Sequence, residues 1–238
     1  MKRNSSNTII IEAARDRVWA ALTDTGELNR WETTDAHLDL RVGGSFLYEY
    51  AYGPSRPGTF MVVDPPRRLV QDNLVFNDND SYHYLNTIDL EDLDDRRTAV
   101  TVLLEGYGSG VAEQWLRESM DLGWATDLKV LKAYVEDGED IRPVVWQGLR
   151  MGLRYVSADV VTEGQRGIQV LAVVDGAPAA DAGLRPGDVV VALDDREFDD
   201  FRGFRALLSP YKPGDGAVFG VLRDGMPHRV PLTFGSAM

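Results

Sequence analysis

The feature that most constrains this 238-residue chain is a long helical stripe that follows several alternating segments. Between residues 111 and 135, apolar side chains recur with the three-and-four spacing of one helix face. The members of this stripe are Trp124, Leu128, Leu131 and Tyr134. Upstream, residues 82–90 and 98–107 flank an acidic turn and alternate as the strands of a hairpin do. A meander of antiparallel strands that ends in one long helix predicts an α+β fold.

The charge of the chain changes part of the way along it. Residues 1–140 hold 14 Lys and Arg against 26 Asp and Glu, a net of −12, whereas residues 141–238 hold 11 against 12, a net of −1. The step coincides with an acidic segment, 136–143, that contains Gly and Pro and has no apolar period. Such segments commonly separate domains. The predicted division is a first domain at 8–138, a linker at 139–147 and a second domain at 148–235.

Composition excludes several classes of function. The net charge of −13 disfavours nucleic acids and anionic membranes as partners. The chain has no cysteine and no metal-ligand spacing, phosphate loop or nucleophile elbow, so we predict no metal, no cofactor and no catalytic residue. No apolar run approaches the roughly 20 residues that span a bilayer. The N-terminal apolar run is too short for a signal peptide, which leads us to expect a cytoplasmic protein.

Four pieces of the first domain resemble one known family in order and spacing. They are Ala14–Trp19 (ARDRVW), Leu40–Phe46 (LRVGGSF), Gly58–Leu69 with its Asp-Pro-Pro turn, and Gly123-Trp124 with the stripe that follows. Together they resemble the SRPBCC (START-like) superfamily, in the branch related to the activator of heat-shock-protein-90 ATPase. The resemblance implies a helix-grip fold, an antiparallel sheet wrapped on a long C-terminal helix, with a hydrophobic cavity. This superfamily binds lipids, polyketides and proteins, so the fold alone implies no single activity.

The cavity implied by this resemblance would take an apolar small molecule. Aromatic and apolar side chains on the sheet and the helix are the candidates for its lining, and ordinary core packing is the alternative for each of them. Tyrosine hydroxyls in such a cleft would orient a ligand by hydrogen bonding. The predicted cavity residues are Phe46, Tyr48, Tyr50, His83, Trp115, Trp124 and Leu128. His83 is the one histidine on these strands, and an exposed or satisfied histidine is the alternative for it.

The second domain carries denser motifs. Residues 176–189 read GAPAADAGLRPGDV, and Lys212–Asp215 (KPGD) and Leu222–Gly225 (LRDG) follow. This arrangement is similar to the PDZ domains of HtrA-type proteases. The resemblance implies a β-sandwich or barrel with two helices. It also implies that the C-terminus of a partner protein binds as an added strand, with its carboxylate held by backbone N–H groups of a glycine loop.

Two segments fit the pattern of this loop, which places a glycine between hydrophobic residues. Arg150-Met151-Gly152-Leu153 fits better than the segment 146–149, where Gln147 is polar. From the helix expected at 201–208, spacings of four and three place three residues toward the groove. The predicted peptide-binding residues are Arg150, Met151, Gly152, Leu153, Tyr155, Phe201, Arg205 and Leu208. The alternative is a groove filled by the chain's own segment or used as a domain interface.

These patterns predict an adaptor that is not an enzyme. Its second domain would hold a protein C-terminus, and its first would bind an apolar ligand or a second protein. Two alternatives stay open: a co-chaperone like the activators of the named branch, and a cyclase- or hydratase-type enzyme of the superfamily. The enzyme would need polar groups inside the cavity, for which His83 and the tyrosines are the candidates.

Overall fold

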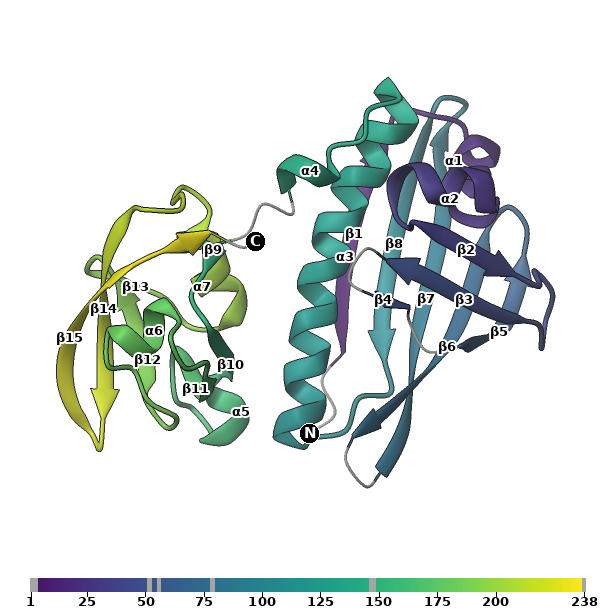
Figure 1. Cartoon of the computed structure of the whole chain (residues 1–238). Helices are drawn as coiled ribbons and strands as arrows, with labels where there is room; N and C mark the ends of the chain where they lie inside the picture. Colours follow the sequence, from purple (N-terminus) through teal and green to yellow (C-terminus); the bar gives the residue numbers. More distant parts are fainter. Residues whose placement is uncertain (1–3, 51–52, 55–56, 78–79, 146–148, 237–238) are drawn as a thin grey trace. The chain divides into compact units, whose positions relative to one another are not determined.

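The computed structural model describes residues 4–50, 53–54, 57–77, 80–145 and 149–236. The chain divides into two compact units (Figure 1). The first contains Met1–Gly108 and Ser119–Val145, and the second contains Ser109–Glu118 and Trp146–Met238. No helix in the described part of the chain is long and apolar enough to cross a membrane.

The first unit is built on one antiparallel sheet. Its strands are β1 (Ser5–Ile11), β2 (Asp35–Leu38), β3 (Ser45–Tyr50), β4 (Gly53–Pro54), β5 (Gly58–Asp64), β6 (Arg68–Asn77), β7 (Asp80–Asp94) and β8 (Arg97–Glu105). They lie in the order β1-β8-β7-β6-β5-β3-β2, with β4 paired to β3. The predicted hairpin is β7–β8, whose strands are joined by the turn at 95–96. The sheet curls along the helix α3 (Val111–Asp137), so the predicted helix-grip fold is confirmed (Figure 1).

Short helices connect the first strands. They are α1 (Arg15–Thr23) and α2 (Thr25–Trp31), and a further short helix, α4 (Arg142–Val145), follows α3. Helix α2 begins where the Asp24 side chain accepts a hydrogen bond from the Glu27 N–H at 2.9 Å. Such an N-cap satisfies one of the backbone donors that the first turn leaves free.

The core of the first unit lies between the concave face of the sheet and α3. Alternate β8 residues Val100, Val102 and Leu104 are fully buried. The helix stripe predicted from the sequence is buried as well, with Trp124 the most exposed of its four members at 7%. Burying each such side chain contributes about 1.5–3 kcal/mol to the stability of the fold, so the packing of this stripe holds the helix against the sheet.

The second unit contains a second antiparallel sheet in the order β10-β11-β12-β14-β15, with β13 paired to β12 and a separate pair β16–β9. These strands are β9 (Leu149–Arg150), β10 (Leu153–Ser157), β11 (Ile168–Val173), β12 (Val189–Leu193), β13 (Arg196–Glu197), β14 (Gly216–Arg223), β15 (Met226–Thr233) and β16 (Gly235–Ser236). Its helices are α5 (Ala158–Val161), α6 (Pro178–Asp181) and α7 (Phe201–Leu208). The predicted β-rich second domain is therefore confirmed.

Aromatic rings form the centre of the second unit. Phe204, fully buried on α7, meets Phe219 of β14 edge to face at 5.9 Å and Tyr155 of β10 at 5.2 Å. Edge-to-face pairs at such distances add to the free energy of burial alone. The Asp200 side chain caps α7 by accepting from the Gly203 N–H at 2.8 Å. This cap and this cluster fix the helix beside β10, where a peptide is expected.

Part of the predicted linker, 139–147, is regular structure. Within it the Arg142 guanidinium donates to the Thr33 carbonyl at 3.0 Å and the Arg30 carbonyl at 3.1 Å. It also forms an ion pair with Asp140 at 2.8 Å. The beginning of this segment therefore packs on the first unit, and residues 146–148 lie outside the described residues.

Candidate functional site

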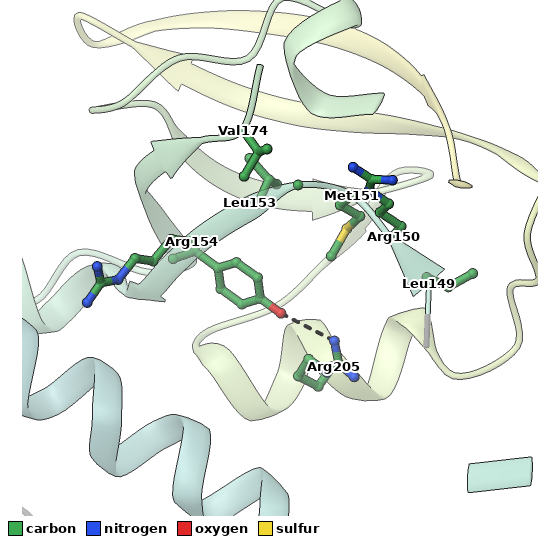
Figure 2. A pocket seen from close by; sticks show the side chains of 9 residues that line it. Leu149, Arg150, Met151, Leu153, Arg154, Val174 and Arg205 are labelled. Atoms are coloured by element: carbon green, nitrogen blue, oxygen red, sulfur yellow. Dashed lines mark hydrogen bonds between the residues drawn. The ribbon is translucent and has the colours of Figure 1, made fainter. Parts of the chain in front are cut away.

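A groove of about 640 Å³ runs along the edge of the second unit (Figure 2). Strand β9, the loop after it and β10 form one wall of the groove. Val174, just after β11, and Arg205 of α7 complete the lining. Its lining residues are Leu149, Arg150, Met151, Gly152, Leu153, Arg154, Tyr155, Val174 and Arg205.

Strand β10 lies at one end of its sheet. It pairs with β11 on one side, and no described strand of that sheet pairs with its other side. A strand edge of this kind presents a row of N–H and C=O groups to which an extended peptide adds as a further strand. The groove therefore offers backbone pairing along β10 together with side-chain contacts from α7.

The loop before β10 needs glycine at its centre. Gly152 has φ +76°, and a Cβ there would lie 2.1 Å from the Cβ of Ala177. Two carbonyls of the loop accept hydrogen bonds. The Met151 carbonyl accepts from the Ala179 N–H at 2.9 Å, and the Gly152 carbonyl accepts from the Val174 N–H at 2.8 Å. The loop thus has one backbone shape, held by close packing and by hydrogen bonds.

The N–H groups of this loop stay free. Within the described part of the chain, the N–H groups of Met151 and Gly152 donate no hydrogen bond. Because the C=O and N–H of one peptide unit point in opposite directions, fixing the Met151 carbonyl toward α6 turns the Gly152 N–H away from α6. Two adjacent backbone donors of this kind are suited to an anion.

Arginine side chains surround the same groove. Arg150 and Arg154 are exposed, and Arg205 is half-buried on α7. The Arg205 guanidinium reaches the Tyr155 hydroxyl through Nη1 at 3.5 Å, drawn as the dashed line in Figure 2. Burial raises the pKa of Tyr155 and the Arg205 charge opposes that rise, so the hydroxyl is neutral at pH 7. The groove is therefore positive, although the chain as a whole is acidic.

The structure brings most of the predicted peptide-binding residues together. Arg150, Met151, Gly152, Leu153, Tyr155 and Arg205 line one groove. Phe201 and Leu208 do not line it; they are 6% and 4% exposed, and the Phe201 ring packs on Tyr155 at 5.2 Å. Spacing alone placed 201, 205 and 208 on one face, but the buried face of α7 runs through 201, 204 and 208.

The second candidate for the loop, 146–149, falls largely outside the described residues. Leu149 alone of that segment is described, and it lines the groove. Val174 was missed by sequence reasoning, because nothing local marks the end of β11 as a neighbour of Gly152. Arg154, which was not among the predicted residues, also borders the groove, on the side away from Arg205 (Figure 2).

The concave face of the first unit forms a second candidate site. Phe46 is 2% exposed and packs against the rings of Tyr48 at 5.2 Å and Phe60 at 5.1 Å. The Tyr48 hydroxyl accepts from the Gln71 Nε2 at 2.6 Å. Of the predicted cavity residues, Phe46, Trp124 and Leu128 are buried, while Tyr48 and Tyr50 keep accessible surface.

Two carboxyl groups lie in this apolar setting. Burial, together with the charge of Asp127, raises the pKa of Glu32 to about 8, and burial raises the pKa of Asp127 to about 7. The Tyr50 hydroxyl donates to Glu32 Oε1 at 3.4 Å. At neutral pH the pair therefore retains protons that exposed carboxyls would lose. Such a pair can accept hydrogen bonds from a ligand or move a proton.

A buried amide lies on the same face. Asn86 is 3% exposed, and its Oδ1 has no hydrogen-bond partner among the described residues. Asn86 pairs in register with Gln71, whose amide contacts Tyr48. The interior thus holds polar groups among its apolar side chains, and the Asn86 amide oxygen is a free acceptor among the described residues.

Two predicted cavity residues lie elsewhere. His83 is exposed and its Nδ1 lies 2.9 Å from Asp72, while its neighbour Tyr84 is buried, so alternation along β7 turns His83 to the outer face. Trp115 belongs to the second unit, where the Arg154 guanidinium lies 4.0 Å from the centre of its ring.

Sequence reasoning missed Glu32, Asp127 and Asn86. Asp127, which is half-buried, lies three residues after Trp124 beside the buried stripe, and a carboxyl next to such a stripe is a signal that could have found it. Asn86 alternates with Tyr84 and Ile88 on the inner face of β7.

Comparison with known families identifies both units. Residues 12–136, more than half of the chain, match the family model described as Activator of Hsp90 ATPase homolog 1-like protein. Residues 120–233 match the model of the PDZ domain. The chain belongs to the Activator of Hsp90 ATPase homolog 1-like family and carries a PDZ domain, which confirms both resemblances.

Curated relatives match the PDZ region. A probable periplasmic serine endoprotease DegP-like of Chlamydia trachomatis is 30% identical over 109 residues, 44% of this chain and 21% of its own length. The periplasmic pH-dependent serine endoprotease DegQ of Escherichia coli is 30% identical over 86 residues, 34% of this chain and 19% of its own length. The chain spans about a fifth of the length of these two relatives.

Among solved structures, the Aha1 dimer from Colwellia psychrerythraea resembles the chain with a TM-score of 0.51 and 19% identity. The match covers 58% of this chain and 98% of that one. At this identity the likeness concerns the fold alone.

Proposed function

We propose that this chain is a binding adaptor that is not an enzyme. Its PDZ domain takes the free C-terminus of a partner protein as an added strand, and its first domain binds an apolar ligand or a second protein. The two family matches support a binding role of this general kind. The proposal includes independent folding of domains 8–138 and 148–235 and a cytoplasmic location.

One observation carries the peptide part of this proposal. The N–H groups of Met151 and Gly152, which have no partner among the described residues, lie beside the edge of β10, in a groove that Arg150 makes positive. A peptide carboxylate would take both donors while its backbone pairs with β10. The apolar side chains of Met151, Leu153 and Val174 line the same groove and favour an apolar final residue.

The experiment compares peptides on the full chain by fluorescence anisotropy. Peptides ending in Val, Leu, Ile, Phe or Ala should bind as free acids, and their C-terminal amides should bind roughly tenfold or more weakly, since a charge-assisted hydrogen bond is lost. Arg150→Ala should weaken the acid more than the amide. Equal binding of acids and amides across a diverse library would contradict carboxylate capture and favour an internal docking surface.

A second site is proposed in the first domain, because its interior combines apolar packing with the acceptors Glu32, Asp127 and Asn86. The ligand would be an apolar molecule whose polar end donates hydrogen bonds. Saturable binding of a member of a hydrophobic ligand panel, altered by Trp124→Ala, would support it. Absence of binding by every member would favour plain core packing.

Two alternatives for the first domain follow from particular observations. The family is named for activation of the Hsp90 ATPase, so stimulation of that ATPase by this chain would support a co-chaperone. The raised pKa values of Glu32 and Asp127 suit proton transfer, so turnover that Glu32→Gln abolishes would support an enzyme.

A further inference from the structure

We propose that the first turns of α3 end the strand pairing along β10, so that a bound C-terminus pairs with β10 over its last three residues only. Glu118 and Trp115 are the residues that set this limit. The inference rests on the proposed peptide binding and adds the length of the paired segment and the class of partner. It uses residues 109–118 of the chain, which belong to the second unit.

Two hydrogen bonds fix which backbone groups of β10 point toward β11. At the start of the strand, the Gly152 carbonyl accepts from the Val174 N–H at 2.8 Å. At its end, the Ala158 N–H donates to the Gly167 carbonyl at 2.9 Å. Val174 follows β11 directly and Gly167 precedes it, so both bonds lie on the β11 side of β10. The backbone groups between them alternate in direction.

The N–H groups of three β10 residues therefore point away from β11. They belong to Leu153, Tyr155 and Ser157, because alternate residues of a strand share one direction and the two ends of β10 are fixed. The register of the β10–β11 pair shifts between Arg154 and Tyr155, but the extra residue of that shift lies on β11, so the alternation along β10 is unbroken. These three N–H groups are the donors that an added strand would use.

The last of these donors already has a partner on α3. The Ser157 N–H donates to Glu118 Oε2 at 2.9 Å, and the two residues are only 4% and 5% exposed. The Ser157 Oγ in turn accepts from the Phe201 N–H at 3.0 Å, which ties Ser157 to the start of α7. Glu118 also pairs with Arg117 at 3.2 Å. The Glu118 carboxyl therefore occupies the place where the carbonyl of an added strand would accept.

A second contact from α3 lies at the same end of the groove. Trp115 precedes Glu118 by three residues, so the two side chains share one face of the helix. The Arg154 guanidinium lies 4.0 Å from the centre of the Trp115 ring. Arg154 borders the groove on the side away from Arg205 (Figure 2). One face of α3 thus supplies an acceptor for the β10 edge and an aromatic ring beside it, and a helix placed in this way protects a strand edge from further pairing.

The position of Glu118 determines how many ligand residues can pair. A ligand whose C-terminus lies at Gly152 runs antiparallel to β10, and every second residue exchanges hydrogen bonds with the strand. Its last residue is level with Leu153, its third from the end with Tyr155 and its fifth from the end with Ser157. The carbonyl of the third residue can accept from the Tyr155 N–H, whereas the donor level with the fifth is held by Glu118. Pairing therefore ends at the third residue.

This limit defines the class of partner. Three extended residues span about 10 Å, and they suffice to reach the glycine loop and pair with β10. The residues upstream of them can remain in folded structure. The partner is therefore a folded protein whose C-terminal tail protrudes by only a few residues, and a longer tail gains no further backbone pairing.

The test uses the full chain and an octapeptide acid with an apolar last residue, measured by competition with a labelled copy. Two analogues replace one peptide bond by an ester, which weakens the carbonyl of the third residue in one and of the fifth in the other. Each ester also removes an N–H that alternation turns away from β10, so the analogues are matched. The ester at the third residue should weaken binding about threefold. The ester at the fifth should leave binding unchanged, and an acetylated tripeptide should bind as tightly as the octapeptide.

Variants then assign the limit to α3. The double variant Trp115→Ala with Glu118→Ala frees the Ser157 N–H, so the octapeptide should bind about fivefold more tightly than the tripeptide, the fold-change of one backbone hydrogen bond. The ester at the fifth residue should now weaken binding. Glu118→Gln keeps an acceptor for the Ser157 N–H and should match the wild type in both comparisons. A folding defect in the double variant leaves the ester comparison on the wild type intact.

The outcomes separate this inference from the proposed function. If neither ester weakens binding, strand addition itself is contradicted and the inference falls with it. If both esters weaken binding to the wild type, strand addition stands and the limit at the third residue is overturned. A folded double variant that binds the octapeptide and the tripeptide equally would show that α3 does not set the limit, and would also overturn the inference.

Discussion

The two candidate sites of this chain have opposite chemistry. The interior of the first unit holds two carboxyls and a buried amide oxygen, at Glu32, Asp127 and Asn86. Among its described lining residues, the groove of the second unit presents backbone N–H groups and guanidinium groups and no carboxylate. A ligand that donates hydrogen bonds suits the first, and an acidic ligand suits the second. One chain therefore offers two sites that need not compete for the same partner.

The sites also differ in what builds them, and this difference gives the largest predicted effect. The groove depends on backbone shape at Gly152, where a Cβ would lie 2.1 Å from that of Ala177. Gly152→Ala should destabilise the second unit by about 3 kcal/mol, since it combines a positive φ with overpacking. Peptide binding should be lost. Hydrogen exchange of the β10 and β11 amides would measure the change within that unit.

Gly183→Ala is the matched control. Gly183 also has a positive φ, +81°, but nothing lies within 4 Å of its added Cβ. That variant should lose only about 1–2 kcal/mol of folding stability, the cost of a left-handed backbone for a residue with a Cβ, and it should keep peptide binding. If both variants behave alike, the close approach to Ala177 is not what shapes the loop.

The next prediction concerns the carboxyls of the first unit. The folded-state pKa values of Glu32 and Asp127, about 8 and about 7, lie above the ordinary values of 4.5 and 3.8. Their contribution to stability is therefore present below about pH 4 and is lost as the pH rises through 7 to 8. The double variant Glu32→Gln with Asp127→Asn should be more stable than wild type at pH 8, by about 1–3 kcal/mol.

Urea unfolding at pH 5 and pH 8 would measure this difference, which should shrink at the lower pH. The amide at position 32 keeps an acceptor for the Tyr50 hydroxyl, so the variant removes charge with little loss of contact. Asp95→Asn, in the exposed turn between β7 and β8, is the control and should show no such pH dependence. A double variant less stable than wild type at pH 8 would mean that the carboxyls are needed in their charged form.

Sequence predicted the groove better than the interior, for a physical reason. A glycine loop of this kind is a local feature: the pattern around Gly152 specifies its backbone, and the residues that follow form β10, the strand at the edge of its sheet. The helix stripe from Trp124 to Tyr134 is local in the same way, because its period shows in one segment. Both could be predicted before any contact was known.

The remaining features depend on contacts between distant segments. Glu32 follows α2 and Asp127 lies on α3. Nothing in the sequence of either segment indicates that the two carboxyls lie close enough to interact. The face of α7 was assigned by spacing, yet the same spacing allows Phe201 to belong to the buried side, where it meets Tyr155. Spacing predicts which residues share a helix face, but the packed structure decides which face is buried.

The smallest predicted effect tests the contrast in charge between the two sites. Raising salt from about 0.1 M to about 1 M shortens the screening length from about 10 Å to about 3 Å. Peptide binding at the groove should weaken severalfold, because Arg150 is exposed and Arg205 half-buried, so both are open to screening. Binding of an uncharged apolar ligand to the first domain should be unchanged or slightly tighter, since salt strengthens apolar burial. Arg205→Gln should reduce the salt dependence of peptide binding. Lys212→Gln, which removes an exposed positive charge outside the groove, should not. Titrations at four salt concentrations would measure both slopes, and equal slopes for the two ligands would mean that the arginines of the groove do not set its selectivity.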